Sequence, residues 1–319
     1  PLPSHSAIRP LFPDRFLFGF HSVTTSPLLP DCMPRRKHPV YFQAHRECKY
    51  TNISKICKTS TQLCAISQKY LPLQDNKRHF AVMTIEDIAL QMTPGIGVKG
   101  AVHLLGIFGD ARGIFAAAPE ELAMKAVLRE DIIRNIVHRK GFAAAEKELG
   151  YCRRNSIAAI ASTDPEFPVL LREIPDYPHV LYLKGNAAAL SARCVAMVGT
   201  RRATPYGQTM CNRLVEGLAA QVPELCIVSG LAFGIDVAAH RAALAAGVRT
   251  VAVLANPLPG VMPAQHTAVA RDILDHGGAL VTELHSQTRQ NGTAYLARNR
   301  IIAGLGAGCV VVELSLIHI

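Results

Sequence analysis

The sequence lacks several features that would assign a function directly. Its first 82 residues contain no apolar run of the length that a signal peptide or a membrane span requires. The cysteines have no metal-ligand spacing, and no phosphate-binding P-loop lysine is present. No nucleophile stands in a recognisable pattern with a base. We therefore expect no catalytic residues, no metal site and no cofactor.

Basic residues exceed acidic residues, but unevenly along the chain. Lys and Arg number 34 against 24 Asp and Glu, which gives a formal net charge of +10 over 319 residues. Residues 1–82 hold 12 of those 34 cations and 4 of the 24 acids, so the remainder carries 22 against 20, or +2. A basic chain favours a nucleic-acid partner, yet the nearly neutral later part requires any anion site there to be local.

Residues 1–82 also hold 9 of the 20 prolines and 4 of the 9 cysteines, without helical or strand periodicity. Two interpretations fit: a disordered basic arm, or an extension that is not native to a protein beginning at Met83. We favour the second. The other five cysteines are expected to be buried free thiols in a reducing cytoplasm: Cys152, Cys194, Cys211, Cys226 and Cys309.

From Met83 the pattern becomes helical. Residues 85–92 predict a helix, residues 93–97 a tight turn, and apolar positions beyond the turn a second helix. Further helical patterns follow to residue 150. We predict a small all-helical domain over 83–150.

Residues 151–313 alternate between strand and helix patterns. A strand is predicted at 180–184, then strands at 194–199, 225–229, 249–254, 279–283 and 309–313, with helices near 205–220, 235–246, 264–276 and 295–304. Met210, Leu214 and Leu218 predict a single buried stripe on the first of these helices. Continuous apolar strands separated by helices indicate an α/β fold, a Rossmann-like parallel sheet covered on both faces. Ligands gather at the carboxyl ends of such strands. The tail 314–319 does not continue the pattern, and we expect it to be foreign or frayed.

One glycine pattern lies in the helical region. Residues 95–100 match the dinucleotide fingerprint, but a helix and a proline precede them instead of a strand. A helix-hairpin-helix turn fits better, with Gly95, Gly97 and Lys99 as possible DNA contacts. The alternative is an αα-corner that only packs.

Two strand-to-helix turns carry the stronger signals. Gly199, Thr200, Arg201 and Arg202 follow the 194–199 strand, where backbone N–H groups and an arginine fork can hold a phosphate. The alternative is a surface salt bridge of Arg201. Thr204 is suited to cap the following helix.

The second turn contains Ser229, Gly230, Phe233 and Gly234. An exposed Phe233 ring would offer a stacking surface to an unpaired base; the alternative is inward packing. Asp236 and His240 share a helix face nearby. We expect Asp236 to tie the turn and His240 to pack beside it, instead of acting as acid and base.

A last candidate stands at the start of the final helix. Arg298, Asn299 and Arg300 could grip a nucleic-acid backbone, and the alternative is a solvated helix end.

Together these segments resemble the DNA-processing protein A family (DprA, also called Smf). The resemblance rests on 198–201, on 229–236 with 238–240, and on 297–305, in matching order and spacing over roughly 83–313. It implies an extended Rossmann domain that binds single-stranded DNA without catalysis. It also implies protection of DNA during natural transformation, loading of a RecA-type recombinase, and a homodimer. Residues 83–150 resemble the family's helix-hairpin-helix or sterile-alpha-motif-like region.

The sequence departs from the family in three places. Many members carry a DNA-binding lysine where this chain has Phe233, so stacking would replace a cationic contact. The sheet segments that follow the last strand in the family, and a C-terminal winged-helix domain, do not follow residue 313 in the given sequence, so we expect the Rossmann-like domain over 151–313 to be incomplete at its end. The resemblance also implies that Arg201 is the arginine that binds a DNA phosphate.

Two other functions remain open from the sequence. A Rossmann-like enzyme acting on a nucleotide or phosphoribosyl substrate could use the same glycine turns, with Asp236 and Glu283 as its candidate carboxylates. An interaction scaffold would use the turns only structurally.

Overall fold

The structure is a computed structural model that describes residues 41–43, 83–289 and 292–314. The expectations for 1–82 and 314–319 lie outside the described residues, apart from 41–43 and Leu314.

Six helices open the main part of the chain, as the 83–150 pattern predicts. They are α1 (Ile85–Met92), α2 (Val98–Phe108), α3 (Ala111–Ala116), α4 (Pro119–Ala126), α5 (Glu130–Val137) and α6 (Phe142–Arg154). Helices α2 to α5 bury a core of their own, to which α1 contributes Leu90. The neighbouring residues Ile88 and Ala89 of α1, with Ala145 and Cys152 of α6, pack instead in a core beneath the sheet. Helices α1 and α6 therefore join the helical part to the α/β part.

A single sheet forms the centre of the molecule. Its strands are β1 (Tyr41–Gln43), β2 (Ala158–Ala161), β3 (Val180–Gly185), β4 (Arg193–Val198), β5 (Leu225–Ser229), β6 (Arg249–Val253), β7 (Ala279–Thr282) and β8 (Cys309–Val311). Their order across the sheet is β1-β8-β4-β5-β6-β7-β3-β2. The five strands from β8 to β7 are parallel, as predicted. The parallel strands are extended at both edges, where β3, β2 and β1 run antiparallel to their neighbours, so the whole sheet is mixed and not parallel throughout.

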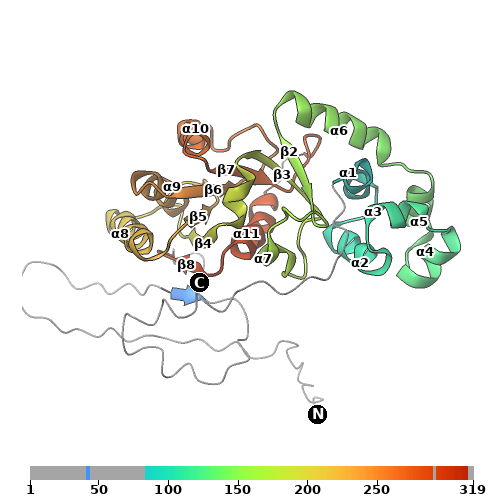
Figure 1. Ribbon diagram of the computed structural model, residues 1–319, viewed down its shortest axis with the longest axis horizontal. Coiled ribbons are helices and arrows are strands. Elements are labelled where there is room, and N and C mark those ends of the chain that lie inside the picture. The colour runs from blue at the N-terminus through green and yellow to red at the C-terminus, as the bar shows by residue number, and fades with distance from the viewer. Residues whose placement is uncertain (1–40, 44–82, 290–291, 315–319) are drawn as a thin grey trace, which may run out of the picture.

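Helices cover both faces of the sheet, as predicted (Figure 1). One face carries α7 (Val169–Arg172), α11 (Ala294–Leu305) and the 3-10 helix η3 (Ala187–Ser191). The other carries α8 (Pro205–Gln221), α9 (Ile235–Ala245) and α10 (Thr267–Asp275), which the 3-10 helix η4 (Ala264–His266) precedes.

The period of two along each strand sends alternate residues to opposite faces. Ile227 of β5 packs with α8 and α9, whereas Val228 packs on the α11 face. Both are fully buried. Such two-sided burial explains why the strands read as continuous apolar runs.

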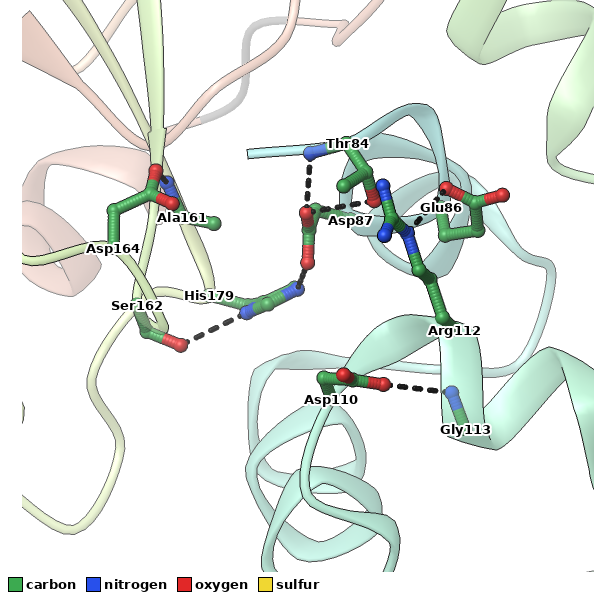
Figure 2. Close-up of polar contacts among 10 residues, drawn as sticks. All are labelled: Thr84, Glu86, Asp87, Asp110, Arg112, Gly113, Ala161, Ser162, Asp164 and His179. Carbon is green, nitrogen blue, oxygen red and sulfur yellow. Dashed lines mark hydrogen bonds and ion pairs between the residues drawn. The ribbon is translucent and has the colours of Figure 1, made fainter. Parts of the chain in front are cut away.

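Buried polar contacts hold the start of α1 against β2 and β3 (Figure 2). The Ser162 hydroxyl lies 2.9 Å from Nδ1 of His179, whose Nε2 lies 3.1 Å from Oδ1 of Asp87. The other oxygen of Asp87 accepts from the Thr84 amide and hydroxyl, which completes a capping box. All three members of the chain Ser162–His179–Asp87 are buried. The first turn of α1 is thus tied to the sheet edge by groups 75 or more residues apart.

A second tie joins the helical part to the loop that follows β7. The buried Glu148 carboxylate of α6 accepts from the Ser286 amide and hydroxyl. Gln91 of α1 donates to the Glu283 carbonyl and accepts from the Tyr182 hydroxyl. This loop leads into α11, so the helical part helps to position that helix.

The cysteines follow the sequence prediction within the described residues. None of the five described cysteines forms a disulfide. Four of them are buried, and Cys309 is half-buried. Burial raises the pKa of Cys211 to about 12, which keeps this thiol protonated.

A glycine permits the close approach of α1 and α6. A side chain at Gly141 would overlap the Ala89 carbonyl oxygen and would lie 2.8 Å from the Thr93 hydroxyl. We predict that Gly141→Ala lowers the free energy of unfolding by about 1–3 kcal/mol, measured by urea denaturation, because the helices must move apart.

Gly217 supplies the matched control. It lies within α8 with nothing near its missing side chain, so Gly217→Ala should raise stability by about 0.5–1 kcal/mol. A Gly141→Ala protein as stable as the parent would show that the α1–α6 contact is loose.

Candidate functional site

The candidate residues converge where the parallel strands end. The chain leaves β4 toward β5, β6 and β7 on one side and returns through α11 to β8 on the other. Strand order therefore reverses beside β4, and such a reversal opens a crevice at the carboxyl ends of the strands. The 199–204 loop leaves β4 at this point, and the 230–234 loop leaves the neighbouring β5.

The first loop is held by hydrogen bonds to Glu313, which lies just beyond the end of β8. The Thr200 amide donates to the Glu313 carbonyl at 2.7 Å, and the Thr204 amide donates to the Glu313 carboxylate at 3.0 Å. The Arg202 amide donates to the Thr200 hydroxyl. Thr204 caps α8 as expected, since its hydroxyl accepts from the Gly207 amide at 3.0 Å.

These contacts change the expected mode of anion binding at this turn. The Thr200, Arg202 and Thr204 amides bond within the protein, and a carboxylate already lies beside the α8 N-terminus. These three amides are therefore used within the protein, and the side chains of the loop become the clearer candidates for contact with a phosphate. Arg201 and Arg202 are both exposed, and the Arg201 guanidinium carbon lies 5.1 Å from the ring centre of Tyr295. This cation–π contact orients Arg201 at the edge of the sheet.

The second loop is folded around Asp236. This buried carboxylate, in the first turn of α9, accepts from the Gly230 and Ala232 amides and so ties the turn, as expected. Ser229 is fully buried and donates to the Met197 carbonyl at 2.6 Å. Ser229 and the Gly230 amide are thus engaged in holding the loop.

Gly234 joins the two loops. Its φ of +79° is in the left-handed region, and a side chain there would overlap the Thr200 carbonyl oxygen and lie 2.8 Å from Arg201 Cα. The Ile235 amide donates to the same Thr200 carbonyl at 3.1 Å. On the other side Gly199 lies against Ile235. The backbones at 199–201 and 234–235 therefore form one packed joint.

Phe233 emerges next to that joint. Its side chain is 46% exposed, which matches the expected exposed ring. One part of the ring contacts His266 edge to face, with ring centres 4.9 Å apart and planes at 66°. The exposed part is available for stacking.

The arginines of α11 differ from the expectation. Arg298 is buried, donates to the Val253 carbonyl at 2.7 Å and lies 3.9 Å from Asp236. Arg300 pairs with Glu283 and lies 3.5 Å from Asp176. Asn299 is the exposed member of the three. Arg298 pairs with the buried Asp236 and Arg300 with the partly buried Glu283, a use that the local sequence could not reveal because these carboxylates come from other elements.

The same ion pairs involve Asp236 and Glu283, the two carboxylates considered for catalysis. Burial raises the pKa of Asp236, and the Arg298 guanidinium acts in the opposite direction. Burial also raises the pKa of Glu283, against the effect of Arg300. Each carboxylate is engaged by an arginine of the same chain.

His240 is fully buried beneath the second loop. Its Nδ1 lies 2.7 Å from the Thr250 hydroxyl, which donates to the Ile227 carbonyl. Nδ1 therefore carries the proton of a neutral ring. Burial lowers the pKa of His240 to about 3, with Arg298 and His266 acting in the same direction. The expected packing role of His240 is confirmed.

The glycine turn of the helical part is separate from these loops. Gly95 packs on Ile132, Gly97 begins α2, and Lys99 is exposed in its first turn. Helix α2 packs against α1, α3 and α4. The predicted turn between two helices is present, whereas its contact with DNA as a helix-hairpin-helix stays a prediction.

Three residues of the site were missed by sequence reasoning. Tyr295 and His266 contact the side chains of Arg201 and Phe233, and Glu313 fixes the first loop. Only Glu313 had a sequence signal, its place directly after the last predicted strand.

The residues that the structure describes contain no group of three or more His, Cys, Asp or Glu residues placed to hold a metal ion. Among their helices, none combines the length and apolar character needed to cross a membrane.

The fold and the joined loops define the class: an α/β protein of Rossmann type with its candidate site at the carboxyl edge of the sheet. The family model of DNA recombination-mediator protein A matches residues 158–316. The α/β part of the chain, over residues 158–316, belongs to the DprA/Smf family of DNA-processing proteins.

Relatives and a solved structure agree with this assignment. Protein Smf of Escherichia coli K12 is 40% identical over 154 residues, 48% of this chain and 41% of that protein. DNA processing protein DprA of Bacillus subtilis 168 is 35% identical over 167 residues, 50% of this chain and 54% of that protein. The X-ray structure of DprA from Streptococcus pneumoniae is 28% identical, with a TM-score of 0.59 over 71% of this chain and 76% of that one. The chain spans about half the length of the curated relatives it matches.

The environment of His240 predicts a pH dependence of stability. Its pKa is about 3 in the folded protein and about 6.5 when unfolded. The unfolded chain therefore binds a proton first as the pH falls, and stability present above pH 6.5 is lost toward pH 3. At pH 5 this loss is about 2 kcal/mol.

The test is urea unfolding at pH 7.5 and 5.0. His240→Asn keeps a donor toward Thr250 but cannot titrate, so its stability should fall by about 2 kcal/mol less than that of the parent. The exposed His276 gives the control, His276→Asn, which should keep the parent's profile. Parallel profiles for parent and His240→Asn would contradict a neutral buried His240.

Proposed function

We propose that the α/β part of this chain binds single-stranded DNA and serves DNA uptake and recombination without turning over a substrate. Membership of the DprA/Smf family supports the DNA-processing role. One observation supports the single-stranded form of DNA: the Gly234 joint brings the backbone of the exposed Arg201 against the residue that follows the exposed Phe233.

The chemistry of these two side chains suits an unpaired strand. Arg201 offers a planar fork to a phosphate, and Phe233 offers an aromatic face to a base that has no partner strand. Base stacking on an aromatic side chain contributes roughly 1–3 kcal/mol per base. In a duplex the base faces are already stacked on one another, so the Phe233 contact would be lost.

Two further exposed residues extend this proposal. Arg202 neighbours Arg201 and adds a cation, and the neutral Asn299 is exposed in the first half of α11 and offers an amide. We include both as contacts to the DNA backbone, with the 95–99 turn as a second contact in the helical part. Arg298 and Arg300 act behind the surface, where they shape the loops.

The wider role follows from the family resemblance. We propose that the protein acts in the cytoplasm as a homodimer, protects incoming single-stranded DNA and loads a RecA-type recombinase onto it.

Binding of the full chain to a fluorescently labelled oligo-dT, measured by anisotropy across a salt series, tests the function. We predict tighter binding to the single strand than to a matched duplex. Arg201→Ala should weaken binding and flatten the log–log salt slope by about 0.7, one phosphate contact. Arg213→Ala, an exposed arginine within α8, should leave the slope unchanged.

Equal slopes for the parent and Arg201→Ala would remove Arg201 from the interface. A folded parent that ignores oligo-dT but turns over a mononucleotide would replace the proposal with the enzyme alternative.

A further inference from the structure

His266 links the base-stacking ring to the loop that carries it. It lies in η4, the 3-10 helix that precedes α10, and is 5% exposed. Its Nδ1 lies 2.7 Å from the Leu231 carbonyl. Because a carbonyl only accepts, Nδ1 carries a proton and donates, which fixes the orientation of the ring. The same ring then meets Phe233 edge to face.

Leu231 is a position where the backbone needs such support. Its φ of +56° is uncommon for a residue with a side chain, and that side chain is fully buried. A strained conformation of this kind persists only where several contacts determine it. The bond from His266 is one of them, and Phe233 follows only two residues later.

We propose that His266 is a positioning residue for unpaired bases: it holds the 230–234 loop through Leu231 and supports the Phe233 ring in the orientation that stacks. This inference rests on the proposed binding of single-stranded DNA. It adds that base stacking on Phe233 depends on the connection between β6 and α10. His266 would act through Phe233 and would not need to contact DNA itself.

The experiment uses an oligo-dT with one central 2-aminopurine, whose fluorescence is quenched when the base stacks. The parent, Phe233→Ala, His266→Ala and the double variant are compared by affinity, quenching and salt slope. His266→Ala should weaken binding by about 3- to 10-fold, the effect of one lost hydrogen bond, and should reduce quenching. The salt slope should not change, because stacking releases no counterions.

The double variant tests the route of the effect. If His266 acts through Phe233, His266→Ala has no further effect on affinity or quenching in the Phe233→Ala background. Equal losses in both backgrounds would show that His266 acts independently and would overturn the proposal.

Two conservative variants separate the contacts of His266. His266→Asn keeps a donor near the Nδ1 position and removes the ring; His266→Phe keeps a ring and removes the donor. We predict intermediate quenching for each, and His266→Asn carries the test if His266→Ala does not fold. Full parental quenching in both variants would overturn the proposal.

His276→Ala is the matched control, since this exposed histidine also bonds a backbone carbonyl through Nδ1, that of Asp272 at 2.7 Å. It should behave as the parent. The proposed function and the positioning role can fail separately. If the folded parent does not bind oligo-dT, the proposed function is contradicted. If His266→Ala binds as the parent does, with unchanged quenching, only the positioning role is contradicted.

Discussion

The contact between Gly234 and the Thr200–Arg201 backbone is the constraint on which the site depends. It has room for no side chain, and it requires a left-handed φ that glycine adopts readily. Through it the loops after two neighbouring strands pack as one unit. A charged and an aromatic residue, 32 residues apart in the chain, are then carried on adjoining backbone, with Arg201 over Tyr295 and Phe233 against His266.

Carboxylates support both loops of this joint. The buried Asp236 holds the amides of the second loop and is balanced by Arg298, while the partly buried Glu313 accepts hydrogen bonds from the first loop. Arg298 is thus used inside the protein, where an unpaired Asp236 charge would be costly. The cations left for a nucleic acid are therefore few and local, in agreement with the nearly neutral composition beyond residue 82.

The fold was predictable because its signal is local. Parallel strands buried on both faces read as apolar runs, and the five predicted from 194 to 313 agree with β4 to β8 within two residues. The antiparallel edge was not predictable, since short strands such as β2 carry no orientation in their sequence. The stripe predicted on α8 is off by one residue: Cys211 and Val215 are fully buried, whereas Met210 and Leu214 pack at their side.

The candidate site was predictable only where a property depends on one residue and its neighbours in the chain. Exposure of Phe233 and capping by Thr204 follow from positions within a turn. The burial of Arg298 depends on Asp236, 62 positions earlier, and the orientation of the Phe233 ring on His266, which comes from η4. Such pairings arise from the topology of the sheet, which brings distant loops to one edge.

The most direct test of this account is oligo-dT binding by Gly234→Ala, with Gly247→Ala as control. Gly247 also has a left-handed φ, +69°, but open space around it, so its variant carries the backbone strain without the clash. The account predicts that Gly234→Ala loses the arginine component of the salt slope and the 2-aminopurine quenching together, while Gly247→Ala binds as the parent does. Loss of only one component, or parental binding by a folded Gly234→Ala protein, would contradict the claim that one joint builds the site.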